Sequence, residues 1–368
     1  MQAVILVGGE GTRLRPLTSS VPKPIVRLVD RPMMVFMLEW LHGHGIDDVI
    51  MSCGFKATDV RRVLGDGSQL GISLRFVEEP DPRGTAGALK FAEEFLDDRF
   101  LMLNGDVLTD LDLTAQIAQH EQTGATGTLA LVPVLDPTSY GLVSLHDDQS
   151  VKEFLEKPSA DQVVDTNLIS AGAYVLERSV LDLIPPGEKV SIEREVWPVL
   201  VDQGLYGFVD ESAYWLDVGT PDRYLQATFD ILEGNVRTAV ADKLGTSYLD
   251  IDPSAEVDGR AVPPAVIGRD TAVAAGAHVG SLAVLADRVS VGVDSVVERS
   301  VVLDGAQIGE HCILRDCIVG PGACVGDRSQ IIGGAMLGAG VKVGADNVVA
   351  HGARLFPGME VPDGGLVF

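Results

Sequence analysis

Short apolar runs alternate with amphipathic stretches through the first 230 residues or so of the chain. Short apolar runs predict buried strands, whereas apolar residues spaced three and four apart predict helices. The predicted strands of the first half lie at 3–7, 49–52, 73–77 and 100–103, and the predicted helices lie near 34–41, 59–64 and 86–96. This alternation predicts an α/β fold with a Rossmann-like, mostly parallel sheet that is covered by helices.

A different pattern begins at about residue 251, where glycine and other small residues become frequent. One aliphatic residue recurs at every sixth position from Ile267 to Leu303; after two one-residue slips through Ile308 and Leu314, the spacing resumes at Val319. A disordered glycine-rich tail would not keep this frame. A six-residue period is typical of a parallel β-helix, in which each flat side contributes one inward aliphatic residue.

The change of pattern also divides the chain. Its 368 residues exceed what one hydrophobic core usually supports, so two domains are expected. We predict an N-terminal α/β domain at 1–235, a linker at 236–250 and a hexapeptide-repeat β-helix domain at 251–368.

The first predicted strand opens directly into a glycine-rich segment at residues 8–18. Glycines there allow backbone N–H groups to approach an anion, and Arg13, Arg15 and Lys23 supply positive charge nearby. The segment has neither the Gly-Lys-Ser/Thr ending of a P-loop nor the third glycine of a dinucleotide fingerprint. It therefore indicates a triphosphate site of another type.

The chain is strongly acidic, with 28 Lys and Arg against 53 Asp and Glu and a net charge of −25. This charge argues against a nucleic acid or an anionic membrane as partner. If the ligands are anionic, local cations such as Arg13, Lys23 and Lys157, together with a bound metal, must reverse the field at the site.

The remaining composition suggests an intracellular protein. The four cysteines form no C-x-x-C pair and are expected to be small buried hydrophobes. The N-terminus lacks the basic region of a signal peptide, and no apolar stretch reaches the length of about 18 residues that a membrane span needs. We expect a cytoplasmic location.

The segment at 8–18, followed by Pro22-Lys23-Pro24, resembles the signature of the sugar-1-phosphate nucleotidylyltransferases. Segments at 103–106, 154–158, 191–198 and 214–221 and the hexapeptide tail extend the resemblance over nearly the whole chain, which is most similar to mannose-1-phosphate guanylyltransferases. The resemblance implies a left-handed β-helix tail and transfer from GTP to mannose 1-phosphate, giving GDP-mannose and pyrophosphate by Mg²⁺-dependent in-line attack on the α-phosphate.

The same resemblance assigns the chemistry to particular residues. Arg13 would neutralise charge on the α-phosphate and the departing pyrophosphate, and Lys23 would hold the two reacting phosphates together. Asp106 and Asp217 match two metal-binding aspartates, whose carboxylates suit Mg²⁺; Asp106 is also counted as catalytic. Arg15 is a weaker candidate for a role in catalysis. The nucleotide-binding residues would be Leu6, Gly8, Gly9, Gly11, Thr12, Arg13, Glu79, Gly84 and Thr85.

The sugar phosphate would be bound by Gly141, Glu156, Lys157 and Ser170. Glu156 would accept hydrogen bonds from sugar hydroxyls and Lys157 would pair with the phosphate. The sequence departs from the family pattern at Ser170, where guanylyltransferases usually have asparagine. No residue distinguishes mannose from glucose, which differs from it at one hydroxyl group.

Glu79 predicts guanine as the base. A carboxylate only accepts hydrogen bonds, and guanine offers adjacent N1–H and N2–H donors. Uracil and thymine offer one N–H between two carbonyls, and uridylyl and thymidylyl relatives typically have glutamine at this place. Glu78 remains an alternative reader of the base.

Two other functions remain open. The chain could be a uridylyl- or thymidylyltransferase acting on glucose 1-phosphate, or a non-catalytic regulatory or scaffold homologue. The presence of Arg13, Lys23, Asp106 and Asp217 argues against an inactive homologue. The flat sides of the predicted β-helix favour a homo-oligomer.

Overall fold

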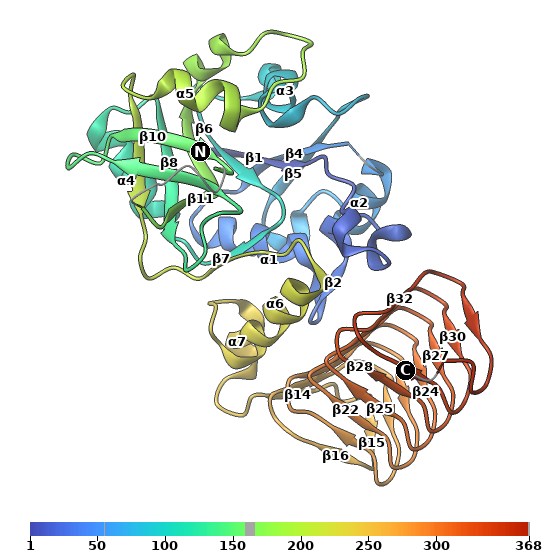
Figure 1. The fold of residues 1–368 in the computed structure, drawn as a ribbon. Coiled ribbons are helices and arrows are strands. Elements are labelled where there is room, and N and C mark those ends of the chain that lie inside the picture. Colours follow the sequence, from blue (N-terminus) through green and yellow to red (C-terminus); the bar gives the residue numbers. More distant parts are fainter. Residues whose placement is uncertain (55, 159–165, 367–368) are drawn as a thin grey trace. The chain divides into compact units, whose positions relative to one another are not determined.

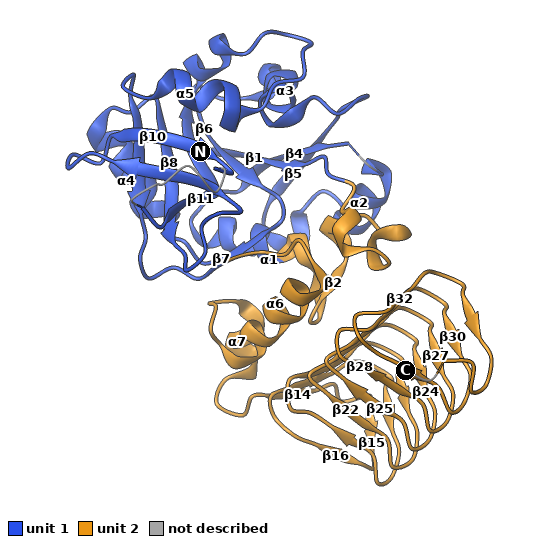
Figure 2. Cartoon of the chain, viewed as in Figure 1, with its two compact units in different colours: residues 1–9, 36–215 blue, residues 10–35, 216–368 orange. Residues whose placement is uncertain are grey.

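The computed structural model describes residues 1–54, 56–158 and 166–366. The chain forms two compact units, which Figure 2 shows in blue and orange. Residues 1–9 and 36–215 make up the first, here called the sheet unit, and residues 10–35 and 216–368 make up the second, here called the β-helix unit. The chain passes from one unit to the other between Gly9 and Glu10, so the glycine-rich segment contributes residues to both.

The sheet unit is built on one mixed sheet of nine described strands (Figure 1). The main order is β10-β9-β11-β6-β1-β4-β5, and β8 pairs with β11 and β12. The predicted parallel arrangement is confirmed for β6, β1, β4 and β5, whereas β11 runs antiparallel to β6, β8 and β9. The strands are β1 (Gln2–Val7), β4 (Asp48–Cys53), β5 (Ser73–Glu78), β6 (Arg99–Asn104), β8 (Gly127–Pro133), β9 (Gly141–Leu145), β10 (Val151–Glu156), β11 (Leu168–Glu177) and β12 (Leu205–Val209).

Helices cover this sheet, and the predicted ones are present. They are α1 (Met33–Gly43), α2 (Ala57–Leu64), α3 (Gly84–Phe91), α4 (Leu113–Thr123) and α5 (Trp197–Leu200), with a π-helix at Ile192–Val196 and 3-10 helices at Ser68–Leu70, Glu93–Phe95 and Arg178–Leu183. Ala3, Val4 and Ile5 of β1 are fully buried. A central parallel strand needs apolar residues on both of its faces, which explains the unbroken apolar run at the start of the chain.

The parallel strands bring several chain segments to one edge of the sheet. Leu6 of β1 lies in register with Ser52 of β4 and with Asn104 of β6, so the residues that follow these strands emerge at the same edge. In open α/β sheets, ligands bind outside the carboxyl ends of the strands. Two further short strands are β7 (Val107–Thr109) and β13 (Trp215–Asp217).

The β-helix unit begins with the segment 10–35. It contains 3-10 turns at Thr12–Leu14, Leu17–Ser19 and Lys23–Ile25, and a short hairpin of β2 (Arg27–Leu28) and β3 (Arg31–Pro32). After residue 216 come α6 (Pro221–Glu233) and α7 (Ala239–Leu244), the second within the predicted linker. Thr220 caps α6 by accepting a hydrogen bond from the Arg223 N–H, and Gly234 ends the helix in the left-handed conformation.

The remaining chain is a parallel β-helix with three sheets, as the six-residue period predicts. The first sheet contains β14 (Leu249–Ile251), β17 (Ala265–Ile267), β20 (Ala283–Leu285), β23 (Val301–Val302), β26 (Ile318–Val319), β29 (Met336–Leu337) and β32 (Arg354–Leu355). The second contains β15 (Glu256–Val257), β18 (Ala272–Val273), β21 (Ser290–Val291), β24 (Gln307–Ile308), β27 (Cys324–Val325), β30 (Lys342–Val343) and β33 (Glu360–Val361). The third contains β16 (Arg260–Ala261), β19 (His278–Val279), β22 (Val296–Glu298), β25 (Ile313–Arg315), β28 (Gln330–Ile332) and β31 (Val348–Val349).

One position of the predicted repeat was wrong. Val302, not Leu303, lies in register with Leu285 before it and with Val319 after it. The step from Leu285 to Val302 is one residue shorter than the step from Ile267 to Leu285, so the first slip already occurs at Val302. Leu303 is also aliphatic and buried, which is why the spacing alone placed it in the frame.

Two further sequence expectations can be compared with the structure. Cys53, Cys312 and Cys317 are buried free thiols, as predicted, and Cys324 is partly buried. In the described part of the chain, no helix combines the length and the apolar character needed to cross a membrane.

Candidate active site

Glu79 lies directly after β5, and its side chain points to the glycine-rich segment. The residue is 8% exposed, and Oε1 accepts a hydrogen bond of 2.9 Å from Oγ of Ser52. A Cβ atom at Gly8 would lie 4.0 Å from the same oxygen, so the carboxylate stands beside the first glycine. Burial raises the pKa of Glu79, and the hydrogen bond from Ser52 partly offsets this rise.

The glycines that follow β1, β4 and β6 differ in how closely their surroundings are packed. A Cβ at Gly54 would come within 3.3 Å of the Gly8 carbonyl oxygen, so the two loops after β1 and β4 pack closely. Gly9 has open space where its side chain would be. Gly105 donates a backbone hydrogen bond of 3.0 Å to Leu6, and a Cβ there would lie 2.8 Å from the Leu6 oxygen. Only glycine allows this approach, which places Asp106 at the edge where β1 and β6 end.

Gly84 and Thr85 connect α3 to the segment at 190–193. Gly84 has a φ of 70°, and a Cβ there would lie 2.5 Å from the Val190 oxygen. The Thr85 hydroxyl donates to Oε2 of Glu193 at 2.8 Å and accepts from the Ile192 N–H at 2.8 Å. Both residues thus have structural roles, and their binding of a nucleotide stays a prediction.

The predicted sugar-phosphate residues Gly141, Glu156 and Lys157 lie together. Gly141 and Glu156 face each other across β9 and β10, and a Cβ at Gly141 would lie 3.0 Å from Oε2 of Glu156. Lys157 Nζ is 3.6 Å from Oε1 of Glu156, but the lysine side chain is 62% exposed and the glutamate side chain 17%. Burial raises the pKa of Glu156, and the nearby Glu193 carboxylate raises it further, whereas Lys157 lowers it.

Glu193 is the residue that the sequence analysis did not assign. It accepts hydrogen bonds from Thr85 and from Ser191, and its charge adds to the burial that raises the pKa of Tyr174. The Tyr174 hydroxyl is 3.0 Å from Oγ of Ser170. Glu193 therefore belongs to the same polar cluster as Thr85, Glu156 and Ser170. Glu193 lies in a π-helix, and such turns are frequent at functional sites, so this conformation marks the residue as a functional candidate.

In the β-helix unit, Gly11 brings the glycine-rich segment against Lys23. Gly11 has a φ of 63°, and a Cβ there would lie 3.2 Å from Cβ of Lys23 and from Cγ2 of Thr18. The Thr18 hydroxyl donates a hydrogen bond of 2.7 Å to the Gly11 oxygen. Lys23 is only 8% exposed, which is unusual for a lysine and indicates that its charge is engaged inside the protein.

The side chains of Arg13 and Asp217 both lie close to Gly219. A Cβ at Gly219 would be 3.0 Å from Nη2 of Arg13 and 3.3 Å from Oδ2 of Asp217, so a larger residue would crowd both. Asp217 also forms an ion pair with Arg223. Arg15, in contrast, pairs at the surface with Glu10 at 3.1 Å, where such a pair contributes little. Thr12 lies in the turn that carries Arg13.

The two predicted metal ligands belong to different units: Asp106 to the sheet unit and Asp217 to the β-helix unit. Within the described residues, no group of three or more His, Cys, Asp and Glu side chains is arranged to hold a metal ion. Mg²⁺ usually takes one or two carboxylates, with phosphate oxygens and water completing the shell. Two carboxylates would suit a metal that arrives with a triphosphate, and the assignment of Asp106 and Asp217 to Mg²⁺ stays a prediction.

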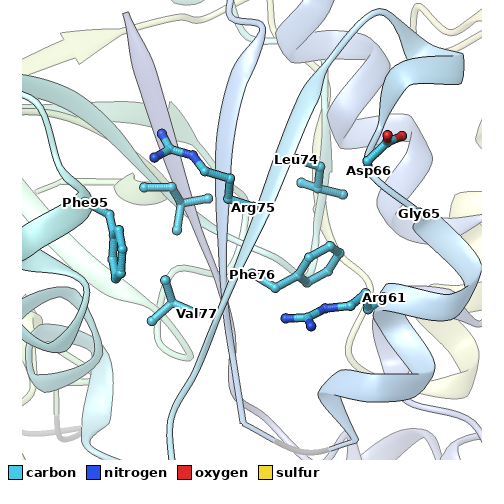
Figure 3. Close-up of a pocket in the computed structure, with 9 residues that line it drawn as sticks. Arg61, Gly65, Asp66, Leu74, Arg75, Phe76, Val77 and Phe95 are labelled. Atoms are coloured by element: carbon cyan, nitrogen blue, oxygen red, sulfur yellow. The ribbon is translucent and has the colours of Figure 1, made fainter.

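A separate hollow of about 480 Å³ lies beside β5 in the sheet unit (Figure 3). Its lining is mostly apolar and includes Phe76, Val77 and Phe95, and the Arg61 guanidinium lies 5.2 Å from the centre of the Phe76 ring. None of the predicted site residues lines it, so the hollow and the predicted site are distinct.

Comparison with known proteins agrees with the sequence motifs. The nucleotidyl transferase family model matches residues 2–234, and the model of the GMPPB C-terminal domain matches residues 261–363. A mannose-1-phosphate guanylyltransferase of Mycobacterium tuberculosis is 37% identical over 375 residues, covering 100% of this chain and 97% of the relative. A UTP–glucose-1-phosphate uridylyltransferase of Synechocystis is 30% identical over 344 residues, covering 88% of each chain.

A solved structure shows the same likeness in three dimensions. HddC from Yersinia pseudotuberculosis, complexed with GMP-PN, is 28% identical with a TM-score of 0.53, and the match covers 61% of this chain and 97% of that one. The predicted resemblance to sugar-1-phosphate nucleotidylyltransferases, and most closely to those named mannose-1-phosphate guanylyltransferases, is confirmed. The chain belongs to the nucleotidyl transferase family.

Proposed function

We propose that the protein transfers a guanylyl group from GTP to mannose 1-phosphate. A phosphate oxygen of the sugar 1-phosphate attacks the α-phosphorus of GTP, the bond from that phosphorus to the bridging oxygen breaks, and pyrophosphate leaves. The products are GDP-mannose and pyrophosphate. The name of the M. tuberculosis relative, which matches the whole chain, supports this pair of substrates.

The observation that carries the choice of GTP is the buried carboxylate of Glu79 beside Gly8. Two carboxylate oxygens can accept the N1–H and N2–H donors of guanine. Uracil would present carbonyl oxygens to the same carboxylate, and a buried polar mismatch of that kind costs orders of magnitude in specificity.

Charge neutralisation is assigned to the cations of the segment 10–35. Arg13 would stabilise the charge that develops on the α-phosphate and on pyrophosphate, and buried Lys23 would hold the attacking and attacked phosphates. Asp106 and Asp217 would hold Mg²⁺, which supplies further neutralisation of phosphate charge. Asp217 would have to exchange its ion pair with Arg223 for the metal.

The polar cluster of the sheet unit would bind the sugar phosphate. Glu156 and Glu193 offer carboxylate oxygens to sugar hydroxyls, and the exposed Lys157 offers its charge to the phosphate. Gly141 lies against Glu156 with its backbone free of a side chain, and Ser170 would offer a hydroxyl where relatives have an asparagine side chain.

Pyrophosphate release tests the proposal directly. GTP, UTP, dTTP and ATP are each supplied with mannose 1-phosphate and with glucose 1-phosphate in the presence of Mg²⁺, and kcat/KM is compared. The highest value is expected for GTP with mannose 1-phosphate. A preference for UTP with glucose 1-phosphate would favour the activity named for the Synechocystis relative. Release from no pair would favour a non-catalytic homologue.

We further propose a cytoplasmic homo-oligomer that assembles through the flat sheets of the β-helix. The proposed substrates are intracellular metabolites, and parallel sheets with regular flat sides suit self-association. Light scattering on the full chain measures the mass in solution, and a monomer at all concentrations would exclude the oligomer.

A further inference from the structure

One of the last coils of the β-helix contacts a turn within the glycine-rich segment. Arg354, the first residue of β32, donates hydrogen bonds from Nη1 to the carbonyl oxygens of Arg13, at 3.2 Å, and of Arg15, at 3.1 Å. All three residues belong to the β-helix unit, which is orange in Figure 2. Residues more than 300 positions apart in the sequence are thus joined directly.

The two carbonyl groups lie at the end of a short helix. Thr12–Leu14 forms a 3-10 turn that closes with a hydrogen bond from the Arg15 N–H to the Thr12 oxygen. The carbonyl oxygens in the last turn of a helix accept no hydrogen bond from within the helix, and they carry partial negative charge. A guanidinium group is a suitable hydrogen-bond donor to these oxygens, so Arg354 caps the turn that contains Arg13.

A second contact holds the same segment further along. Arg27 forms ion pairs with Asp304 at 3.0 Å and with Asp287 at 3.3 Å, both in the β-helix. The Arg27 and Asp287 side chains are mostly buried, and the Tyr224 hydroxyl donates to the Arg27 carbonyl oxygen. The β-helix therefore fastens the segment 10–35 both at the turn and at the hairpin.

We infer that the β-helix positions the phosphate-binding turn and that Arg354 is a positioning residue for Arg13. This inference rests on the proposed function. A turn that is ordered before GTP arrives loses less conformational entropy when GTP binds. Without Arg354, the bound triphosphate must order the turn itself, so KM for GTP should rise while kcat changes less.

The test compares Arg354→Ala with Arg328→Ala in the full chain. Arg328 is also an exposed β-helix arginine, but its guanidinium pairs with Asp346 of the neighbouring coil. Arg354→Ala should raise KM for GTP about threefold to tenfold, as expected for a charge-assisted hydrogen bond. KM for mannose 1-phosphate and kcat should change by less than about twofold, and Arg328→Ala should leave all three values unchanged. Arg354→Lys, which keeps a cationic donor, should fall between wild type and Arg354→Ala.

Amide hydrogen exchange provides a measurement that does not depend on turnover. The amides of residues 11–15 should exchange faster in Arg354→Ala than in wild type, and at the wild-type rate in Arg328→Ala. Unchanged exchange in Arg354→Ala, or an equal effect of both variants, overturns the positioning role. If wild type releases no pyrophosphate from any substrate pair, the proposed function fails, and exchange alone still decides whether Arg354 orders the turn.

Discussion

Ser52 donates a hydrogen bond of 2.9 Å from its hydroxyl group to Oε1 of Glu79, and both residues are buried. Ser52 lies near the end of β4, and Glu79 directly follows the neighbouring strand β5. The bond holds the carboxylate in one orientation beside Gly8. The proposed recognition of the base by Glu79 would therefore depend on Ser52, which fixes the orientation of the carboxylate.

Glu79→Gln should relax the choice of base. The amide replaces one acceptor by a donor, which suits the imide edge of uracil better than the donor edge of guanine. The ratio of kcat/KM for GTP to that for UTP should fall by about tenfold or more. Glu78→Gln is the matched control, because Glu78 is the exposed neighbour on β5. If Glu78→Gln changes the ratio and Glu79→Gln does not, Glu78 reads the base.

GTP binding should weaken at acidic pH. Burial raises the pKa of Glu79, and the Ser52 hydrogen bond lowers it, with a net rise. Guanine needs the ionised carboxylate, so affinity is full above this pKa and is lost as the pH falls through it, at a higher pH than for an exposed glutamate. Ser52→Ala removes the hydrogen bond that lowers the pKa of Glu79, so the affinity for GTP should be lost at a still higher pH. KM for GTP measured against pH tests this, and a shift to lower pH would contradict it.

The sequence predicted those parts of the fold that depend on periodic burial. The strand pattern identified the parallel half of the sheet, and the six-residue period identified the β-helix. It misplaced the repeat at Leu303 because Val302 and Leu303 are both aliphatic, and only the register with Leu285 and Val319 separates them. Spacing identifies a period but cannot tell which of two adjacent apolar residues points inward.

Motifs in the sequence assign residues to the candidate site, whereas contacts between distant residues leave no signal in it. Glu79, Glu156 and Arg13 were assigned from their motifs, and their roles stay predictions. Glu193 was quoted only as part of a longer match, because its hydrogen bond to Thr85 joins residues far apart in the sequence. The ion pair between Asp217 and Arg223 likewise has no signal in the spacing of the two residues.

Replacing either aspartate should impair the use of Mg²⁺. Asp106→Asn and Asp217→Asn each remove a negative charge that favours the metal, so the Mg²⁺ concentration for half-maximal activity should rise at least about tenfold and kcat should fall. Activity titrated with Mg²⁺ at saturating substrates measures both effects. Asp210→Asn serves as a control, since Asp210 caps a turn by accepting from the Ser212 N–H and hydroxyl. An Asp106→Asn enzyme with the wild-type Mg²⁺ profile would remove Asp106 from the metal site.

Arg223→Gln should have the opposite effect on the metal. Arg223 pairs with Asp217, so a metal must compete with a guanidinium for this carboxylate. Without the arginine charge, half-maximal activity should be reached at a Mg²⁺ concentration about twofold to tenfold lower. The same titration measures it. A higher requirement would mean that Arg223 holds Asp217 in place for the metal rather than opposing it.

Gly84→Ala should destabilise the sheet unit, whereas Gly9→Ala should not. Alanine at Gly84 is strained at a φ of 70°, and its Cβ would lie 2.5 Å from the Val190 oxygen, so the free energy of unfolding should fall by at least about 2 kcal/mol. Gly9 has open space around its Cβ position and no positive φ. Tryptophan fluorescence during urea unfolding reports on the sheet unit, since Trp40, Trp197 and Trp215 all belong to it.

The two glycine variants also separate packing from binding. A methyl group at Gly9 would project into the open space that is proposed to hold the triphosphate, so Gly9→Ala should raise KM for GTP at unchanged stability. The main effect of Gly84→Ala should be a lower free energy of unfolding, because the close contact with Val190 requires glycine whether or not a nucleotide is bound. Wild-type stability in Gly84→Ala with a raised KM for GTP would instead mean that the start of α3 yields to the methyl group and that Gly84 serves the nucleotide.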